Sequence, residues 1–428
     1  MELGIDIPES WTKQRIGGVG EVVTGRTPST KRDDFYGGDC NLISPADLDN
    51  GKYVFTAHKK LTRAGLQECR VLPKDTVLVG CIGNVGKLGM VADDRSATNQ
   101  QINAIVANPS NDPHFVYYCL QANRRRLEQA ADKTTLPILN KTNFQNFEIA
   151  IPPLSEQQKI AAVLGVVQRA MEQQERLLAL TAELKEALLH QLFTAGLRGE
   201  PQRQTDIGPV PKSWVVATLE NAAVAFDYGT SVKCEHGKTG VPVLRIPNVV
   251  GGSIDLTDLK HGQPKRSELN ELSLKSGDLL FVRTNGVLEN AGRCALYRGE
   301  MEGCYFASYL IRVRVDSSKV LPAFVNEYAR TERGRSFLSG RAIRTADGKF
   351  NINSGTLKRV LLPLPSLGEQ EEIVRQLDLV ERRLKLLERK HAALTALFRT
   401  LLHELMTAQI RVHALALPEL EAAVAKGK

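Results

Sequence analysis

The chain has 428 residues, of which 42% are hydrophobic and 24% are charged, and its formal net charge is +8. This length predicts two or three domains rather than one ordinary core, and the composition is that of a soluble globular protein. No run of about 18 apolar residues could span a bilayer. The N-terminal sequence MELGIDIPESW has an acidic flank and no apolar export segment, so a cytoplasmic location without membrane contact is expected.

The cysteines and the charge distribution narrow the possible class of protein further. The seven cysteines are scattered, odd in number and contain no CxxC pair, which argues against a disulfide framework and a zinc site. Residues 201–365 hold 23 Lys and Arg against 16 Asp and Glu, whereas residues 1–153 hold 18 against 17. A basic domain is compatible with a polyanion such as nucleic acid, and an ordinary basic surface explains the charge equally well.

The sequence repeats itself at about half its length. Three pairs of segments carry the repeat: IPESW (7–11) with VPKSW (210–214), AIPPLSEQQKI (150–160) with PLPSLGEQEEI (363–373), and LLHQLFTAGLRG (188–199) with LLHELMTAQIRV (401–412). A weaker echo relates LPKDTVLVGCIGNVGK, from Leu72, to LKSGDLLFVRTNGVLENAGR, from Leu274. The pattern indicates a tandem duplication whose ends are well matched and whose middles have diverged.

The expected elements follow the same order in each half. Strands are predicted at 75–83 and 101–107, a helix at 112–131, and then a polar, turn-rich segment that leads into a short strand and prolines. The corresponding strands of the second half are 278–286 and 309–315, and the helix is 321–338. Each half therefore predicts a globule that mixes α and β structure.

A long helix is expected after each globule. SEQQ at 155–158 is a capping-box pattern, and each helix would run for roughly 40 residues, about 60 Å at 1.5 Å per residue. In the second helix, apolar residues alternate in steps of four and three with one polar interruption: Ile373, Leu377, Val380, Leu384, Leu387, His391, Leu394, Phe398, Leu401 and Leu405. This is a coiled-coil seam, and the two helices are expected to bury their seams against each other.

The seam of the first helix is less regular. Gln174, Thr181 and Lys185 occupy three of its ten expected positions, and Leu177, Leu180 and Leu184 offer a shifted apolar stripe in their place. Either pattern could therefore define the coiled-coil register of this helix.

Motifs for catalysis are missing from the sequence. GCIGNVGKLG, from Gly80, fails as a phosphate-binding P-loop because five residues separate Gly80 from Gly86 and Leu88 follows Lys87. A glycine-rich turn whose backbone approaches a ligand is the better interpretation. Neither GxGxxG after a strand, nor HExxH, nor GxSxG occurs. We therefore predict no catalytic and no metal-binding residue, which favours a binding protein.

Polar and basic residues recur in the loops of both globules, where they are candidates for DNA contact because Arg and Lys suit guanine, Asn suits adenine, and all suit phosphates. The candidates of the first globule are Arg26, Thr27, Ser29, Lys31, Asn84, Lys87, Lys133, Thr134, Asn140 and Lys141. Those of the second globule are Arg245, Arg283, Thr284, Asn285, Arg293, Arg341, Arg344, Lys349 and Asn353. Each residue taken singly could equally be a solvated surface group.

The whole organisation resembles the specificity (S, HsdS) subunit of type I restriction-modification systems. The resemblance is carried by the half-length repeat, by IPPLSEQQKI with LPSLGEQEEI, and by the LLHQLFTAGLRG pair, and it covers nearly the whole chain. It implies an α+β fold in which two mixed α/β target recognition domains are joined by two long antiparallel helices that form an intramolecular coiled coil with a pseudo-two-fold repeat. The expected domains are recognition domains at 1–153 and 201–365, helices at 154–200 and 366–412, and a tail at 413–428.

The same resemblance implies a function. Each recognition domain would read one half of a bipartite double-stranded DNA target, and the coiled coil would set the spacer and dock two methyltransferase subunits, with restriction subunits joining the complex. The chain itself would bind no cofactor, since adenine-N6 methylation and ATP-dependent cleavage, with S-adenosylmethionine, ATP and Mg²⁺, would belong to the partners. The residues for partner contact, or for the packing that supports it, are Glu156, Gln157, Glu369, Gln370, His190 and His403. A coiled-coil scaffold that never reads DNA is the alternative, and a self-contained nuclease or methyltransferase is a weaker one.

Overall fold

The computed structural model describes residues 8–132, 136–237 and 239–412, and these form two compact units. Unit 1 contains residues up to 176 and from 388 onward, and unit 2 contains residues 177–387. Each unit thus combines one globule with parts of both long helices. No helix in the described ranges has the length and hydropathy to cross a membrane.

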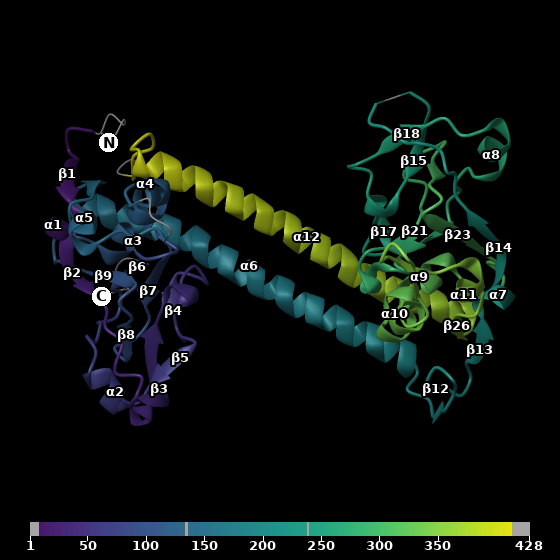
Figure 1. Ribbon diagram of the computed structural model, residues 1–428, viewed down its shortest axis with the longest axis horizontal. Coiled ribbons are helices and arrows are strands. Elements are labelled where there is room, and N and C mark those ends of the chain that lie inside the picture. Colours follow the sequence, from purple (N-terminus) through teal and green to yellow (C-terminus); the bar gives the residue numbers. More distant parts are fainter. Residues whose placement is uncertain (1–7, 133–135, 238, 413–428) are drawn as a thin grey trace. The chain divides into compact units, whose positions relative to one another are not determined.

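The elements of unit 1 mix short strands with short helices. In chain order they are β1 (Thr12–Arg15), α1 (Ile16–Val19), β2 (Gly20–Thr24), η1 (Asp33–Phe35), β3 (Tyr36–Ile43), η2 (Pro45–Asp47), β4 (Tyr53–Val54), β5 (Lys59–Leu61), α2 (Arg63–Gln67), β6 (Val77–Gly80), β7 (Leu88–Val91), β8 (Ser96–Thr98), β9 (Ile102–Ala107), α3 (Pro113–Ala122), α4 (Arg124–Gln129), α5 (Lys141–Gln145) and β10 (Glu148–Ile151). Strands β2-β9-β6-β7-β4 form one sheet, β5-β3-β8 a second, and β1-β10 a third (Figure 1).

Unit 2 repeats this plan with additions. Its elements are β11 (Gln202–Arg203), β12 (Val210–Pro211), β13 (Val215–Thr218), α7 (Leu219–Ala222), β14 (Ala223–Tyr228), β15 (Val241–Leu244), η3 (Ile246–Asn248), β16 (Val249–Val250), β17 (Ser253–Ile254), β18 (Lys260–Gly262), α8 (Arg266–Glu271), β19 (Leu279–Val282), β20 (Thr284–Asn285), η4 (Leu288–Asn290), β21 (Cys294–Leu296), β22 (Tyr305–Phe306), β23 (Leu310–Val315), α9 (Pro322–Arg330), α10 (Glu332–Ser339), β24 (Ile343–Arg344), β25 (Phe350–Asn351), α11 (Ser354–Lys358) and β26 (Leu361–Leu364). The sheets β14-β23-β19-β21, β18-β15-β22 and β13-β26 correspond to the three sheets of unit 1. The sheet β20-β25-β24 lies where unit 1 has the single bridges Ile82–Ile138 and Asp132–Ile138.

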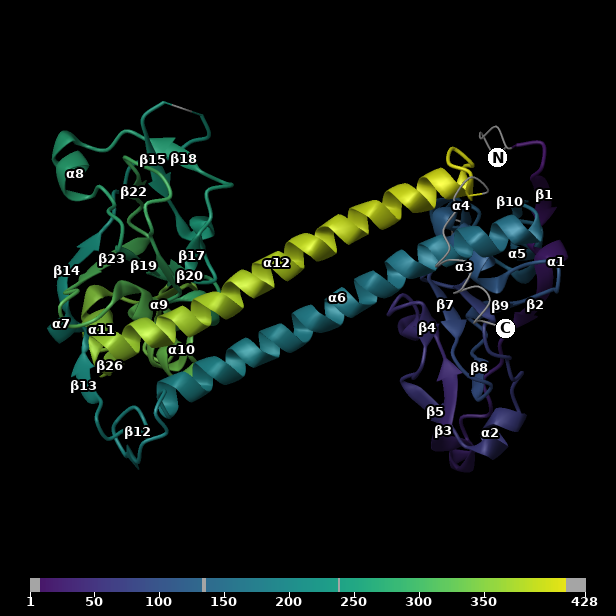
Figure 2. The same cartoon turned by 180° about the vertical axis from the view of Figure 1, so that it is seen from behind.

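The long helices are α6 (Leu154–Thr194) and α12 (Leu367–Met406). Figures 1 and 2 show them side by side and antiparallel. In unit 1 His391 Nε2 lies 3.0 Å from a Glu175 carboxylate oxygen, and in unit 2 Lys185 pairs with Glu381. The predicted fold class, two mixed globules with an antiparallel helix pair and an internal repeat, is confirmed.

The seam of α6 is the polar one. Gln174 and Lys185 are buried and Thr181 is half-buried, whereas Leu177, Leu180 and Leu184 are 44%, 51% and 57% exposed. The shifted stripe that could have replaced the seam is therefore wrong as a packing surface. The buried polar groups are tolerated because they find partners, as Lys185 does with Glu381.

Each globule is completed by the end of one long helix. Phe398, Leu405 and Val412 belong to the same hydrophobic core as Phe115 and Tyr118 of unit 1. In unit 2 the corresponding core includes Leu189, Leu192 and Phe193 from the end of α6. The two copies of the LLH motif therefore serve different globules: the copy on α6 packs in unit 2 and the copy on α12 packs in unit 1.

Candidate nucleic-acid interface

Three chain segments meet through backbone hydrogen bonds in unit 1. Arg26 N donates to Thr98 O (2.9 Å), Cys81 N donates to Gln101 O (2.8 Å) and Leu139 N donates to Cys81 O (2.8 Å). The TGRTPSTKR loop, the glycine-rich turn and the later polar segment, which lie far apart in sequence, thereby form one continuous surface. We call it face 1 and define it as residues 25–31, 80–87, 98–101 and 136–141.

Unit 2 builds the corresponding face 2 with the same bonds. Thr230 N donates to Phe306 O (2.9 Å), Arg283 N donates to Tyr309 O (2.8 Å) and Ile352 N donates to Arg283 O (2.9 Å). Face 2 is defined as residues 228–231, 282–293, 306–309 and 341–354. The equal bonding pattern shows that the two faces are structural counterparts within the repeat.

The glycine-rich turns confirm the weak sequence echo. Gly80 N donates to Lys87 O at 2.8 Å, and Val282 N donates to Arg293 O at 2.8 Å, so Lys87 and Arg293 hold equivalent positions. The glycine before each, Gly86 or Gly292, has a φ of +84° or +85°, a conformation that L side chains rarely adopt. The turn is four residues longer in unit 2, between the matched ends.

The two faces differ in chemistry where their backbones agree. Cys81, Ile82 and Gly83 of unit 1 correspond to Arg283, Thr284 and Asn285 of unit 2. In face 2, Thr284 and Asn285 pair with one edge of β25, and Arg344 pairs with its other edge. Polar and cationic groups that suit base edges and phosphates thus gather in unit 2, at a place that is mainly apolar in unit 1.

Face 2 also contains two tyrosines that were not among the residues predicted from the sequence. Arg283 stacks over the ring of Tyr228 at 4.9 Å, and the Tyr228 hydroxyl donates to Ser354 Oγ at 3.2 Å. Burial by itself would raise the pKa of Tyr228, but these bonds with Ser354 and the charge of Arg283 lower it. Tyr309 is exposed beside Lys349. Their only available signal was the repeat, because they correspond to Thr24 and Gln101 of unit 1.

The charged side chains of face 2 differ in how far they are exposed and already paired within the protein. Arg344 is exposed and has no ion pair within the described residues. The hydrogen bond to Asp347, at 2.8 Å, raises the pKa of Lys349, and the pKa of Asp347 is lowered to about 2 by Lys349 and Thr345. Arg341 stacks on Phe337 at 3.8 Å. Arg293 is exposed, and the side-chain oxygen of Asn353 caps α11.

In face 1, some candidate side chains are hydrogen-bonded within the protein and others are exposed. Thr27 Oγ1 donates to Gln100 Oε1 at 2.8 Å, while Arg26, Ser29, Lys31 and Asn84 are exposed. Lys141 is exposed at the start of α5, and the Asn140 side chain caps that helix. Lys133 and Thr134 lie outside the described residues.

Arg245 is not on face 2. Its Nη2 donates to Asp258 Oδ2 at 2.6 Å and to Asp258 O at 2.9 Å, and the side chain is half-buried. Its guanidinium fixes the loop that follows η3, and its DNA contact stays a prediction.

Gln157 and Gln370 also act within the fold. Gln157 Nε2 donates to Pro152 O (2.9 Å) and its Oε1 accepts from Asp112 N (2.8 Å). Gln370 repeats both bonds, with Pro365 O (3.0 Å) and Leu321 N (2.8 Å). Because both side chains are fully buried, a partner cannot reach them, and the packing alternative holds for these two residues.

Glu156 and Glu369 are likewise buried at the helix starts. Glu156 accepts from Trp11 Nε1 at 3.2 Å and from Arg411 Nε at 2.8 Å, which ties the end of the second LLH motif to the start of α6. Glu369 accepts from Leu197 N at 3.3 Å, at the end of the first LLH motif. His190 and His403, in contrast, are exposed.

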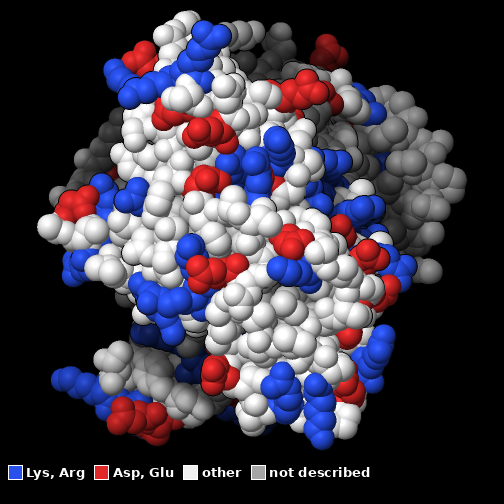
Figure 3. Space-filling view, turned by 90° about the vertical axis from the view of Figure 1, so that its right-hand side faces the viewer, with Lys and Arg blue, Asp and Glu red and all other residues white. Residues whose placement is uncertain are grey.

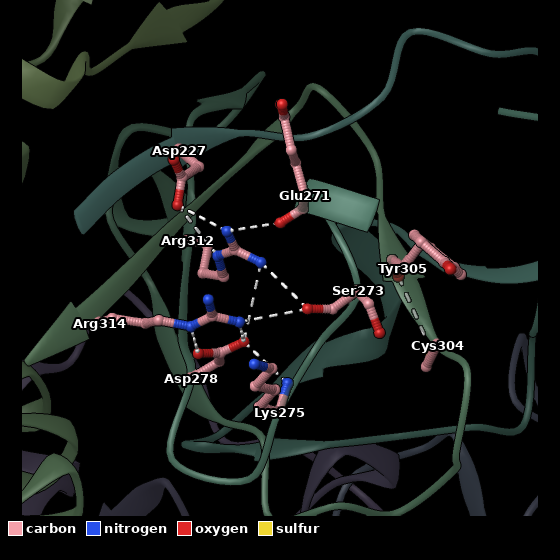
Figure 4. A network of polar contacts seen from close by, with 9 residues as sticks. All are labelled: Asp227, Glu271, Ser273, Lys275, Asp278, Cys304, Tyr305, Arg312 and Arg314. Atoms are coloured by element: carbon pink, nitrogen blue, oxygen red, sulfur yellow. Dashed lines mark hydrogen bonds and ion pairs between the residues drawn. The ribbon is translucent and has the colours of Figure 1, made fainter. Parts of the chain in front are cut away.

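An ionic network beneath face 2 has no counterpart in unit 1. Figure 4 shows Arg312 between Asp227 and the 271–275 loop: Nη2 donates to Asp227 Oδ2 (2.7 Å) and Glu271 O (3.0 Å), and Nη1 donates to Ser273 O (3.1 Å). Arg314 Nε donates to the buried Asp278 (2.6 Å), and this bond raises the pKa of Arg314. The corresponding residues of unit 1 are Val23, Ala104, Val106 and Thr76.

The network attaches the outer sheet β18-β15-β22 to the sheet that carries face 2. Arg312 lies over the ring of Phe306, in β22, at 5.3 Å, and its other bonds hold the loop after α8. The surface of unit 2 seen in Figure 3 carries Lys and Arg interspersed with Asp and Glu among uncharged side chains. Within the described ranges, no three His, Cys, Asp or Glu side chains gather as a metal ion would require.

The fold and the paired faces define a class of protein: two polar-faced mixed globules, each completed by an end of one of two antiparallel helices. Residues 8–182 match the family model described as type I restriction modification DNA specificity domain. The chain is 23% identical over 412 residues to the type I restriction enzyme MjaVIII specificity subunit of Methanocaldococcus jannaschii, covering 96% of this chain and 95% of the relative. It is 24% identical to the EcoKI specificity subunit of Escherichia coli K12, covering 87% and 82%.

Solved structures agree in fold. The crystal structure of the type I restriction-modification S subunit from M. genitalium aligns with a TM-score of 0.61 at 19% identity, covering 95% of this chain and 98% of that one. Over nearly its whole length the chain is therefore similar to specificity subunits of type I restriction enzymes.

We predict that Arg312→Met lowers the free energy of unfolding of unit 2 by about 3–5 kcal/mol, because Asp227 and the buried Asp278 lose a cation in a desolvated place. The measurement is urea denaturation followed by Trp214 fluorescence in a Trp11→Phe background. Arg298→Met is the matched control, since Arg298 is half exposed and lies 3.7 Å from its partner Asp378; it should change stability by less than about 0.5 kcal/mol. Equal midpoints for the two variants would contradict the structural role of the network.

Proposed function

We propose that each globule reads one half of a bipartite double-stranded DNA target through its face. The observation that carries the proposal is the construction of faces 1 and 2. One backbone framework holds the buried Cys81 with the half-buried Ile82 and Gly83 in one unit, and the half-buried Arg283, Thr284 and Asn285 in the other. A shared framework with exchanged side chains is what recognition of two different half-sites requires. Phosphate contacts would position each face and base-edge contacts would specify the sequence.

Methylation and cleavage are assigned, in this proposal, to partner subunits. Two methyltransferase subunits would bring S-adenosylmethionine, and restriction subunits would bring ATP and Mg²⁺, while this chain supplies the DNA specificity. The relatives named above are specificity subunits, which supports this division of labour.

The exposed leucines of α6 offer a docking surface for a methyltransferase helix. Leu177, Leu180 and Leu184 recur at helical spacing on one face, and the Lys185–Glu381 pair places Leu180 level with the exposed Leu386 of α12. A strip of this kind on a helix already packed along its seam suits a further amphipathic helix. Arg383, exposed on α12 without an ion pair in the described chain, favours an acidic flank on that helix.

Removing a phosphate contact tests DNA reading. In the chain purified with its methyltransferase subunits, Arg344→Ala should weaken binding to target DNA and reduce the slope of log K against log salt by about 1. Arg375→Ala is the control, because Arg375 is paired with Glu372 on α12 and lies on neither face. The scaffold alternative requires instead that the wild-type complex show no salt-dependent DNA binding attributable to this chain.

Helix length tests the spacer. Duplicating residues 177–183 in α6 together with 383–389 in α12 adds one heptad to both helices and preserves their seams. Seven residues add about 10.5 Å, close to three base pairs at 3.4 Å each. Mapping methylated adenines should reveal the same two half-sites with a spacer longer by about three base pairs. New half-sites at the old spacing would contradict the proposal.

Charges placed on the leucine strip test docking. Leu180→Glu with Leu184→Glu should abolish co-elution with the methyltransferase subunit while leaving the melting temperature near that of wild type, because both side chains are exposed. Ala182→Glu is the matched control, since Ala182 is exposed on the opposite side of α6. Retained co-elution of the double variant would exclude the strip as the docking surface.

A further inference from the structure

The repeat makes the two helix–globule junctions directly comparable. The Gln157 and Gln370 clamps superimpose α6 on α12 and α3 on α9, so Lys185 on α6 corresponds to Phe398 on α12, Gln168 to Glu381, and Tyr118 to Glu327. Each of these positions lies where a long helix contacts its globule. They should therefore carry similar residues if the junctions were interchangeable.

The junction of unit 2 is ionic. The buried Lys185 pairs with Glu381, and Arg330 lies 3.6 Å from Glu381 and 3.1 Å from Glu327. Burial raises the pKa of Glu327 against the pull of Arg330 and Lys185. Burial would also raise the pKa of Glu381, but the bond from Lys185 and the nearby cations hold it below its ordinary value. Two cations and two carboxylates thus balance in a largely desolvated place.

The junction of unit 1 is aromatic. Phe398 packs edge-on against Tyr118 with ring centroids 6.1 Å apart, and both side chains are buried. The Nζ of Lys52 donates to the Tyr118 hydroxyl at 3.2 Å and has no carboxylate within 4.0 Å in the described chain. Burial lowers the pKa of Lys52 to about 8. The nearby cation Arg169 lowers this pKa further, whereas Asp112, Asp75 and Glu172 raise it from beyond salt-bridge distance. This junction therefore already holds two cations, and Lys52 has no ion pair within the described residues.

The chemistry of each junction excludes the helix that the other accepts. If the α6 of a second copy took the place of α12 in unit 1, its Lys185 would be buried against Tyr118 as a third cation beside Lys52 and Arg169. If the α12 of a second copy took the place of α6 in unit 2, Phe398 would leave Glu327 and Glu381 without their lysine. Both exchanges leave buried charge uncompensated, which is among the costliest changes a protein core can suffer.

We propose that these two junctions are keyed, so that each globule accepts the end of the other long helix and rejects its own helix from a second copy of the chain. The interaction surface is formed by Lys185, Glu327, Arg330 and Glu381 in unit 2 and by Phe398, Tyr118 and Lys52 in unit 1. Apolar seams alone would allow α6 to pair with α6, because the repeat gives both helices similar patterns. The residues of the two junctions direct α6 to pair with α12 of the same chain. They therefore oppose the exchange of helices between two copies of the chain.

Single replacements test the keys in the full-length chain. Lys185→Phe should lower the melting temperature of unit 2, read by Trp214 fluorescence in a Trp11→Phe background, by on the order of 10 °C. Lys185→Arg, which keeps the cation, should lower it far less. Phe398→Lys should destabilise unit 1 to a similar extent, read by Trp11 in a Trp214→Phe background. Equal melting temperatures for Lys185→Phe and wild type would overturn the proposal.

Transplanting one key tests pairing choice. Lys185→Phe with Glu327→Tyr, Arg330→Gln and Glu381→Gln gives unit 2 the residues of unit 1 and should recover stability relative to Lys185→Phe. Its α6 then also fits the junction of unit 1, so two differently tagged full-length chains, mixed and incubated, should exchange and be captured together. Wild-type chains treated alike should not. Exchange of wild-type chains as fast as the transplanted chains would contradict keying, as would a transplanted chain no more stable than Lys185→Phe.

Discussion

Each globule depends on apolar residues that reach it from the far end of the chain's other long helix. Phe398, Leu405 and Val412 complete the core of unit 1, and Leu189, Leu192 and Phe193 complete that of unit 2. Burying these residues requires α6 and α12 to run antiparallel and to stay helical throughout, since water would otherwise contact both seams. The same requirement explains why the LLH motif occurs twice, because two equivalent helix ends must be held by two equivalent globules.

This constraint fixes the part of each globule that packs against the long helices, and it leaves the side chains of faces 1 and 2 able to vary. The buried Gln157 and Gln370 each join a helix start to the start of α3 or α9 by matching hydrogen bonds, so the inner part of both units is held alike. Beyond this frame, side chains can change without disturbing the backbone, as Cys81 and Arg283 illustrate. Unit 2 even replaces the apolar pair Val23 and Ala104 by an ionic pair, Asp227 and Arg312, in the corresponding strands. The proposed reading of two different half-sites would use this separation of a common frame from variable faces.

Local patterns predicted what depends on neighbours in sequence. The 4-3 spacing predicted the seam of α12, SEQQ predicted the start of α6, and the glycine-rich turns led to the equivalence of Lys87 and Arg293. Side chains whose roles depend on distant contacts could not be predicted in the same way. Gln157 was a candidate for partner contact or for the packing that supports it, and its buried amide donates to a backbone carbonyl inside the fold. Arg245 was a candidate for DNA contact, and its guanidinium pairs with Asp258. Tyr228 and Tyr309 join face 2 only because strands from separate segments meet there.

The sequence by itself determined the repeat, the two long helices and the resemblance to type I specificity subunits, because these follow from residue spacing and from matched motifs that persist along the chain. Only the tertiary structure decided which apolar stripe of α6 is buried, since a seam with Gln174 and Lys185 is stable when partners such as Glu381 satisfy it, and Leu177, Leu180 and Leu184 then turn outward. It also decided which polar loop residues share a face. Both choices rest on the pairing of distant groups in a desolvated place, and spacing along a single chain does not encode that pairing.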